Sequence, residues 1–214
     1  MKAATALAPS TVTLPAADLR TMLRVVSPFI SLEIGCGTED LDAVCLNVRD
    51  GKLIASASNR YTFVEYSVPA AGDFDRKKIL IAGPAAKTSL QLLGRPGKDA
   101  LATITVDGDA VRMAVPGMEW SLPHAAGRSI VVDRWIDDAP GLQQKLAKPV
   151  APVTEMGISP TLAAKFGAVA RVLNEYQSTW TFKGPKEPVT IRIGDRFTGW
   201  LMPIKLYPPK DATS

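Results

Sequence analysis

The stretch TLPAADLRTMLRVVSPFI, residues 13–30, joins a short strand pattern to a helix pattern. Within it, apolar residues recur at intervals of three and four positions, at Leu19, Met22, Leu23 and Val26. That spacing predicts one apolar helix face, which has to be buried against another element. The stretch therefore predicts a strand followed by a helix that packs on a sheet.

Three strand patterns follow this helix and complete a unit. They are AVCLNVR at 43–49, LIASAS at 53–58 and TFVEYSV at 62–68. The dipeptide Asp50-Gly51 joins the first two strands and is a strong signal for a hairpin turn. The order of elements in this unit is strand, helix and three strands.

The same order of elements occurs twice more along the chain. The second unit consists of KILIAG, PAAKTSLQLLG, LATITV, AVRMAV and MEWSLP. The third begins near Gly157 with the helix pattern SPTLAAKFGAVARVLNEY and continues with STWTF, VTIRI and FTGWLMPI. One such unit leaves an apolar sheet face for its single helix to cover. The repeats therefore predict an α+β fold, with helices on one face of antiparallel sheets.

The repeats divide the chain into four segments. Residues 1–10 are predicted to be a flexible leader rather than a signal peptide, because polar residues interrupt its apolar part. Residues 11–124 are predicted to form a domain of two repeat units. Residues 125–206 are predicted to hold a linker and a shortened second domain, and 207–214 a flexible tail. Within the linker, residues 125–156 are either an extended connector or a fourth unit that has lost its strands.

The composition and the motifs argue against several classes of protein. No apolar run approaches the roughly 20 residues of a membrane span. Phosphate-binding glycine loops, nucleophile elbows and zinc-protease motifs are absent from the sequence. The single histidine, His124, and the two cysteines, Cys36 and Cys45, are too few for an ordinary metal site, and Cys45 is most simply a core residue. We therefore predict a cytoplasmic protein with no catalytic residues, no metal and no other cofactor.

The helix patterns carry basic residues beside their apolar faces. Arg20 and Arg24 lie one turn apart on the first helix, and Lys87 takes a similar place on the second. Lys165 lies on the third helix at a different angle. An ordinary solvated helix face is one interpretation of these residues. The other is contact with DNA phosphates without reading of the bases, which requires only positive charge on a regular surface.

Three segments resemble the bacterial DNA polymerase III beta subunit family, the sliding clamps. The stretch that begins at residue 13 resembles the strand and helix that open a clamp domain. LIASASNRYTFVEYSVP, residues 53–69, resembles the middle-domain stretch around the family's A-T-D-G-H-R-L motif, which here reads ASNRYTF at 57–63. GWLMPIKL, residues 199–206, resembles the family's C-terminal V-M-P-M-R-L. The resemblance implies that the repeated units are of the DNA clamp type.

Clamps are non-enzymatic rings whose helices surround duplex DNA, and their partners dock a short peptide into an apolar pocket. The resemblance implies that one wall of this pocket is formed by Ser58, Arg60, Tyr61, Thr62 and Phe63. The other wall would be formed by Leu201, Met202, Pro203, Ile204 and Leu206. A purely structural role of this second wall, as a buried edge strand, is the alternative interpretation.

The resemblance also implies the partners of the protein. They would be duplex DNA, bound without sequence specificity through Arg20, Arg24, Lys87 and Lys165, and DNA polymerase or repair proteins that carry a short clamp-binding peptide. No membrane is involved in this function. The predicted function is to tether such partners to DNA, and the alternative is a clamp-derived interaction module that does not encircle DNA.

This chain departs from the family in ways that concern the ring and the pocket. A bacterial clamp chain has six units in three domains, whereas this chain has three units, or four if 125–156 is a degenerate one. Two domains per chain would predict a trimer if six domains close a ring, so a homo-oligomer is one expectation and a monomer the other. Asn-Arg-Tyr-Thr at 59–62 replaces Asp-Gly-His-Arg, which changes backbone freedom and charge. Residues 207–214 extend past the family's usual end and could cover the pocket.

Overall fold

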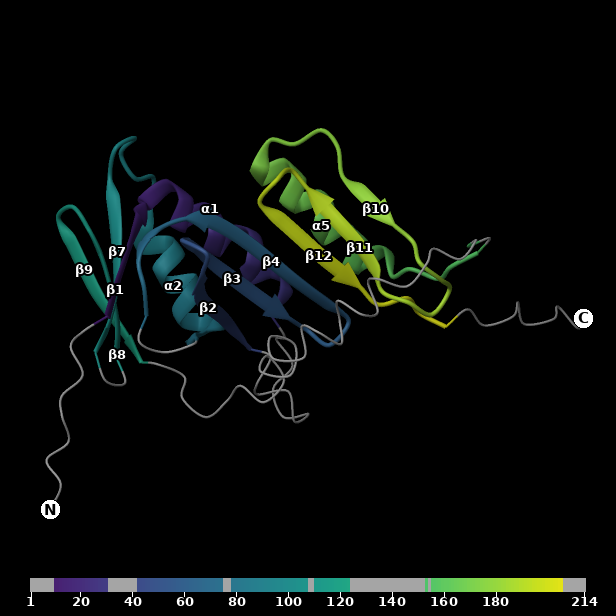
Figure 1. Ribbon diagram of the computed structural model, residues 1–214, viewed down its shortest axis with the longest axis horizontal. Coiled ribbons are helices and arrows are strands. Elements are labelled where there is room, and N and C mark those ends of the chain that lie inside the picture. The colour runs from purple at the N-terminus through teal and green to yellow at the C-terminus, as the bar shows by residue number, and fades with distance from the viewer. Residues whose placement is uncertain are drawn as a thin grey trace, which may run out of the picture.

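The computed structural model describes residues 10–30, 42–74, 78–107, 110–123, 153 and 155–205. Residues 1–9 of the predicted leader, most of the predicted linker and the predicted tail lie outside these residues, as do Cys36, His124 and Leu206, whereas Ser10, the last residue of the predicted leader, already belongs to a strand. Within the described residues, three α-helices accompany two antiparallel sheets, which confirms the predicted α+β class (Figure 1). None of these helices is long and apolar enough to cross a membrane.

The predicted helices and strands are present, except that among the described residues the third unit has no strand before its helix, only an isolated bridge between Gly157 and Ile204. The first unit contains β1 (Ser10–Pro15), α1 (Ala16–Val26), the 3-10 helix η1 (Ser27–Phe29), β2 (Ala43–Arg49), β3 (Lys52–Ser58) and β4 (Thr62–Pro69). The second contains β6 (Ile79–Ala82), α2 (Gly83–Leu93), β7 (Leu101–Asp107), β8 (Ala110–Val115) and β9 (Met118–Pro123), and the short strand β5 (Ala71–Gly72) precedes it. The third contains α5 (Pro160–Leu173), β10 (Thr179–Thr181), β11 (Val189–Ile193) and β12 (Phe197–Leu201).

The helices begin and end where local residue types favour it. Pro84 occupies the first turn of α2, where its missing N–H costs no hydrogen bond, and Gly94 follows the helix with a positive φ of 48°. The hydroxyl oxygen of Ser159 accepts the backbone N–H of Leu162 at 3.4 Å and caps α5. Asn174 ends α5 in the left-handed conformation. The predicted apolar face of α1 is fully buried.

The first two units exchange their first strands. β1 of the first unit pairs with β7, which gives a five-stranded sheet in the order β5-β1-β7-β8-β9. β6 of the second unit pairs with β2 and becomes an edge of a seven-stranded sheet, β10-β11-β12-β4-β3-β2-β6. Neither unit can therefore complete its sheet without the other, and α1 packs against α2 between them.

The third unit extends the seven-stranded sheet of the first. β12 runs antiparallel to β4, with Leu201 opposite Thr62, Trp200 opposite Phe63, and Gly199 opposite Val64 (Figure 1). Strands far apart in the sequence thus lie side by side, because a paired edge satisfies backbone groups that an open edge leaves unbonded.

On the face of the sheet that the helices cover, an aromatic cluster joins the third unit to the first. The ring of Phe166 on α5 lies 5.0 Å from that of Phe29 and 6.2 Å from that of Phe197, measured between centroids. The ammonium of Lys165 donates to the carbonyl of Pro28 at 2.8 Å and lies 5.8 Å from the centroid of the Phe29 ring. The third unit is therefore bound to the first by backbone pairing on one side and by buried rings on the other.

Gly199 leaves the space on β12 into which Phe166 packs, which predicts a substitution effect. An added Cβ would overlap the edge of the Phe166 ring and lie 3.3 Å from a methyl carbon of Val64. We expect Gly199→Ala to lower the free energy of unfolding by about 1–3 kcal/mol, measured by urea denaturation.

Gly167 on α5 provides the matched control. A Cβ at this position meets nothing within 4 Å, and the residue is exposed in the helix interior. Gly167→Ala should raise the free energy of unfolding by about 0.5–1 kcal/mol, because alanine loses less backbone entropy in a helix than glycine does. Effects of the same sign in both variants would contradict the packing described for β12.

Candidate functional site

The loop between β3 and β4, residues 58–63, is shaped by the side chain of Asn59. Its carbonyl oxygen accepts the hydroxyl of Thr62 at 2.7 Å, the backbone N–H of Thr62 at 2.9 Å and that of Tyr61 at 3.2 Å. The hydroxyl of Ser58 donates to the Thr62 carbonyl at 2.9 Å. Asparagine stabilises turns in this way, by hydrogen-bonding the backbone two and three residues on. The 58–63 loop is therefore held in one conformation by its own polar groups.

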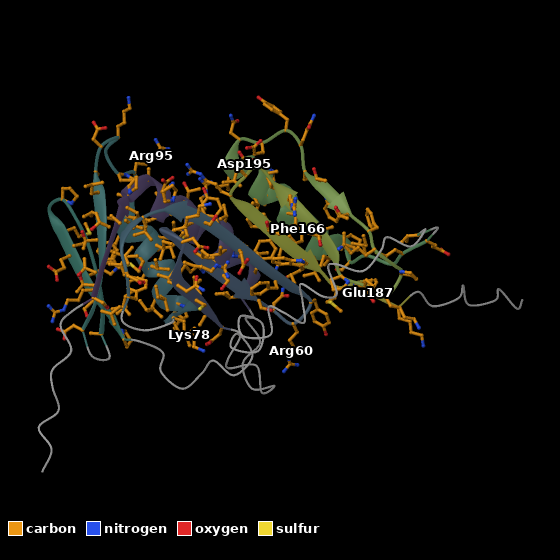
Figure 2. The ribbon with its side chains drawn as sticks, in the orientation of Figure 1. Arg60, Lys78, Arg95, Phe166, Glu187 and Asp195 are labelled. Carbon is orange, nitrogen blue, oxygen red and sulfur yellow. The ribbon has the colours of Figure 1, made fainter. Side chains whose placement is uncertain are left out.

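Arg60 lies at the tip of this loop in a left-handed conformation, with φ of 74°. A non-glycine residue there costs about 1 kcal/mol or more, because its Cβ crowds the following carbonyl. Arg60 aligns with the glycine of the A-T-D-G-H-R-L motif, and it adopts the backbone conformation that glycine favours. Its side chain projects away from the ribbon in Figure 2. The loop thus combines a glycine-type backbone with a cationic side chain at its tip.

Residues 201–204, which we call the 201–204 strip, run beside the 58–63 loop. β12 ends at Leu201, and the backbone N–H of Met202 donates to the carbonyl of Tyr61 at 2.8 Å. Pro203 cannot donate a hydrogen bond and follows the end of the ladder, as expected from the sequence. The N–H of Ile204 then donates to the carbonyl of Gly157 at 2.9 Å. The strip is therefore fixed at both ends, by the loop and by the start of the third unit.

The structure places the described pocket residues close together, but they differ in how much of each side chain is exposed. Those at the surface are Arg60, Tyr61 with 58% of its area exposed, and Ile204 with 46%. Met202 and Pro203 are half-buried. The buried members are Ser58, Thr62, Phe63 and Leu201. The alternative interpretation as a buried edge strand therefore describes Leu201, whereas Ile204 and its neighbours remain available for contact.

Phe63 and Trp200 form a buried pair of rings next to this site. Their rings lie 5.4 Å apart with an interplanar angle of 30°, and both side chains are buried. The indole N–H of Trp200 has no hydrogen-bond partner among the described residues. Sequence reasoning did not select Trp200 or Gly157, because their roles depend on contacts between segments that are distant in the sequence. It also did not select Asn59, whose role lies within its own turn. The turn propensity of Asn59 was the one available signal.

A row of polar side chains crosses the other strands on the same face of the sheet. Cys45 lies opposite Ser56, and Ser56 lies opposite Glu65. Burial raises the pKa of the Cys45 thiol to about 12, opposed by its hydrogen bond with Ser56. Burial likewise raises the pKa of the Glu65 carboxyl, opposed by the charge of Arg49. The thiol stays protonated at neutral pH and is a poor nucleophile, and the prediction that Cys45 is a core residue is confirmed.

The three described α-helices concentrate positive charge. Together they carry five basic residues and one acidic residue, Asp18. The net charge of these helices therefore equals the +4 of the whole chain. Asp18 itself is ion-paired with Arg196 at 3.0 Å, a residue of the third unit.

The four predicted DNA contacts differ in their surroundings. Arg24 and Lys87 are exposed on α1 and α2, and Arg20 is half-buried. Lys165 is bound to the Pro28 carbonyl, and burial lowers the pKa of its ammonium. A phosphate contact is therefore most accessible to Arg24 and Lys87, whereas the charge of Lys165 contributes to packing between helices.

No protein-family model and no curated protein matches this sequence. Solved structures do. The DNA polymerase sliding clamp of Pseudomonas aeruginosa superposes with a TM-score of 0.72 at 12% identity, over 92% of this chain and 66% of that one. The DNA polymerase III beta subunit of Thermotoga maritima gives a TM-score of 0.71 at 13% identity, over 97% and 68%.

The chain has the sliding-clamp fold. A third solved structure, the beta sliding clamp of C. crescentus, agrees with a TM-score of 0.69 at 13% identity, over 96% of this chain and 69% of that one. The chain spans about two thirds of the length of these clamps. The resemblance read from the three sequence segments is thereby confirmed at the level of the fold.

The Asn59 turn predicts a local effect on the loop. Asn59→Ala removes the oxygen that accepts three hydrogen bonds, so we expect faster amide hydrogen exchange at Tyr61 and Thr62. The free energy of unfolding should fall by about 1–2 kcal/mol. Asn59→Asp keeps an acceptor in place and should preserve the protection of both amides. Unchanged exchange in the alanine variant would show that another group holds the loop.

Proposed function

We propose that this chain is a non-enzymatic, clamp-like protein of the cytoplasm that tethers DNA polymerase or repair proteins to DNA. Partners would dock a short peptide on the surface formed by the 58–63 loop and the 201–204 strip. The observation that carries this proposal is the hydrogen bond from the Met202 N–H to the Tyr61 carbonyl, since it joins the two segments that the resemblance assigned to one pocket.

The chemistry of this surface suits an apolar peptide. Tyr61 offers an exposed ring with a polar end, and Ile204 offers an exposed aliphatic chain. Met202 lies between them in sequence and is half-buried, and methionine adapts its shape to different ligands. Two related clamps show that the fold can hold ligands. The C. crescentus structure carries polyethylene glycol at a region described as tethering the β-motif, and a Pseudomonas aeruginosa clamp binds griselimycin.

Tyr61 and Met202 are the residues with which to test the peptide site. Tyr61→Ala and Met202→Ala should each weaken binding of a fluorescent clamp-binding peptide about tenfold in an anisotropy titration, as expected for a central contact residue. Griselimycin should compete with the peptide. Phe63→Ala is a poor test, because Phe63 is buried against Trp200 and its truncation would disturb the fold.

Tyr176→Ala is the matched control for these variants. Tyr176 follows α5, is 96% exposed and lies outside both the loop and the strip. Its truncation removes the same ring as Tyr61→Ala and should leave peptide affinity unchanged. If the wild-type protein binds neither peptide nor griselimycin, the assignment of the peptide site is wrong.

The positive helices support contact with DNA in the same proposal. Their charge is carried by regular secondary structure, which matches binding to phosphates without base reading. The alternative function, an interaction module that does not encircle DNA, is favoured by one observation. Lys165 donates its hydrogen bond inside the chain and Arg20 is half-buried, so two of the four predicted contacts are poorly placed for phosphate.

DNA binding is tested by reversing the two exposed charges. The double variant Arg24→Glu/Lys87→Glu should weaken binding to a short fluorescent duplex. The slope of log affinity against log salt should become shallower by about two, because two phosphates would no longer be neutralised by the protein.

The control Lys52→Glu/Lys186→Glu makes the same change in net charge at exposed residues outside the helices. It should retain most of the affinity and the wild-type slope. Equal decreases in affinity in both double variants would show that total charge, and not the helix surface, governs the interaction. Absence of binding by the wild-type protein would favour the interaction module.

A further inference from the structure

Two buried polar atoms of the third unit have no hydrogen-bond partner in the part of the chain that the structure describes. They are the indole nitrogen of Trp200 on β12 and the hydroxyl oxygen of Thr190 on β11. Trp200 is 8% exposed and Thr190 is 9% exposed. A buried donor without an acceptor lowers the stability of a protein, so its presence in a folded chain calls for an explanation.

The two atoms belong to one cross-strand pair. Thr190 lies directly opposite Trp200 in the β11–β12 ladder, which places their Cβ atoms about 5 Å apart. The neighbouring Ile191 belongs to the hydrophobic core, and Gly199 lies against the ring of Phe166 on the helix side. Because side chains alternate along a strand, Thr190 and Trp200 share the opposite face of the sheet. One ligand group can therefore accept hydrogen bonds from both side chains.

This pair adjoins the candidate peptide site. The ring of Trp200 lies 5.4 Å from that of Phe63, the residue opposite it on β4. Met202 follows two residues later, and its N–H donates to the carbonyl of Tyr61, so the ladder continues to the 58–63 loop. Residues two apart in a strand share a face and lie about 7 Å apart. An extended peptide on Tyr61 and Met202 would therefore reach the pair within about two or three of its own residues.

The chemistry of the pair selects an oxygen acceptor. An indole nitrogen can only donate, and a threonine hydroxyl can donate as well, so two donors are offered to one ligand group. Arg192 lies two residues after Thr190 on the same face of β11, and its side chain is exposed. A carboxylate has two acceptor oxygens and a charge that a guanidinium compensates, and charged acceptors form the stronger hydrogen bonds. A carboxylate is therefore the group that fits best.

We propose that the Thr190–Trp200 pair binds a carboxylate of the docked peptide, from an aspartate or glutamate two or three residues away from the peptide residue that contacts Met202. This inference rests on the proposed function, because the peptide brings the carboxylate to the sheet. Each carboxylate oxygen accepts one hydrogen bond of the pair, and Arg192 supplies the compensating charge. Both donor atoms are covered in the free chain, so binding includes a side-chain rotation of the kind common at interfaces.

The preference of the protein for a carboxylate is the direct test. The probe is the fluorescent clamp-binding peptide with one aspartate placed two or three residues from its apolar anchor, and its twin carries asparagine at that position. The wild-type protein should bind the aspartate peptide about tenfold more tightly, because a hydrogen bond to a charged group is worth more than one to a neutral amide. Equal affinities for the two peptides at every tested position would overturn the inference.

Thr190→Val separates binding from stability. The substitution keeps the shape of the side chain and replaces a buried polar atom that lacks a partner by a methyl group. We expect an equal or higher melting temperature, together with loss of the preference for aspartate. Thr190→Ser retains the hydroxyl and should retain the preference. A lower melting temperature of Thr190→Val with the preference intact would show a purely structural role for the hydroxyl.

Trp200→Phe removes the other donor and keeps an aromatic ring beside Phe63. It should also lose the preference for aspartate, and this ratio of two affinities does not depend on how stable the variant is. The matched control is Asn47, whose side-chain oxygen is likewise buried and without a partner within the described ranges. It lies on β2, three strands away from β12. Asn47→Ala should keep the preference, and its loss there would overturn the assignment to the Thr190–Trp200 pair.

The same titrations distinguish failure of this inference from failure of the proposed function. A wild-type protein that binds neither peptide nor griselimycin would overturn both. If Tyr61→Ala weakens binding while the aspartate and asparagine peptides bind equally well, the docking site stands and the carboxylate site alone is wrong.

Discussion

The antiparallel pairing of β4 with β12 is the interaction on which the candidate site depends. It places Leu201 beside Thr62, so the chain that leaves β12 passes directly over the 58–63 loop. Without this pairing, the two segments would be separated by about two thirds of the chain and would share no surface. The pairing is held by Phe29 and Phe166 on the helix side and by Phe63 and Trp200 on the other. The pairing of these two strand edges therefore produces both the continuous sheet and the candidate site.

Much of the local structure could be predicted from periodicity. The apolar face of α1, the Asp50-Gly51 hairpin and the proline and glycine that delimit α2 all act over a few residues, so the sequence contains their cause. The exchange of β1 and β6 between units could not be predicted in this way. β1 alternates apolar and polar residues and β6 is apolar throughout, and both patterns indicate burial without identifying the neighbouring strand. The choice of neighbour depends on packing across the whole domain.

The same distinction between local and long-range causes applies to the predictions for the candidate site. The resemblance selected both walls, but it could not separate Phe63 and Leu201, which are buried, from Tyr61 and Ile204, which are exposed. Phe63 and Leu201 lie within the paired strands β4 and β12, whereas Tyr61 and Ile204 lie beyond the ends of these strands, so exposure depends on where the pairing stops. Lys165 illustrates the same limit for charge. Its position on α5 is evident from the sequence, whereas its bond to the Pro28 carbonyl requires the contact between two units.

In the 58–63 loop, different groups determine the backbone conformation and the surface that a partner would contact. Asn59 accepts the hydrogen bonds that an aspartate could accept, and Arg60 adopts the left-handed conformation that glycine takes without strain. The backbone path therefore depends on an acceptor at one position and on a tolerated positive φ at the next. Tyr61 carries neither constraint, and Arg60 meets the second one by adopting the positive φ, so both exposed side chains differ from the family motif while the loop holds this path. Divergence in this loop accordingly changes the chemistry presented to a ligand more than it changes the shape of the site.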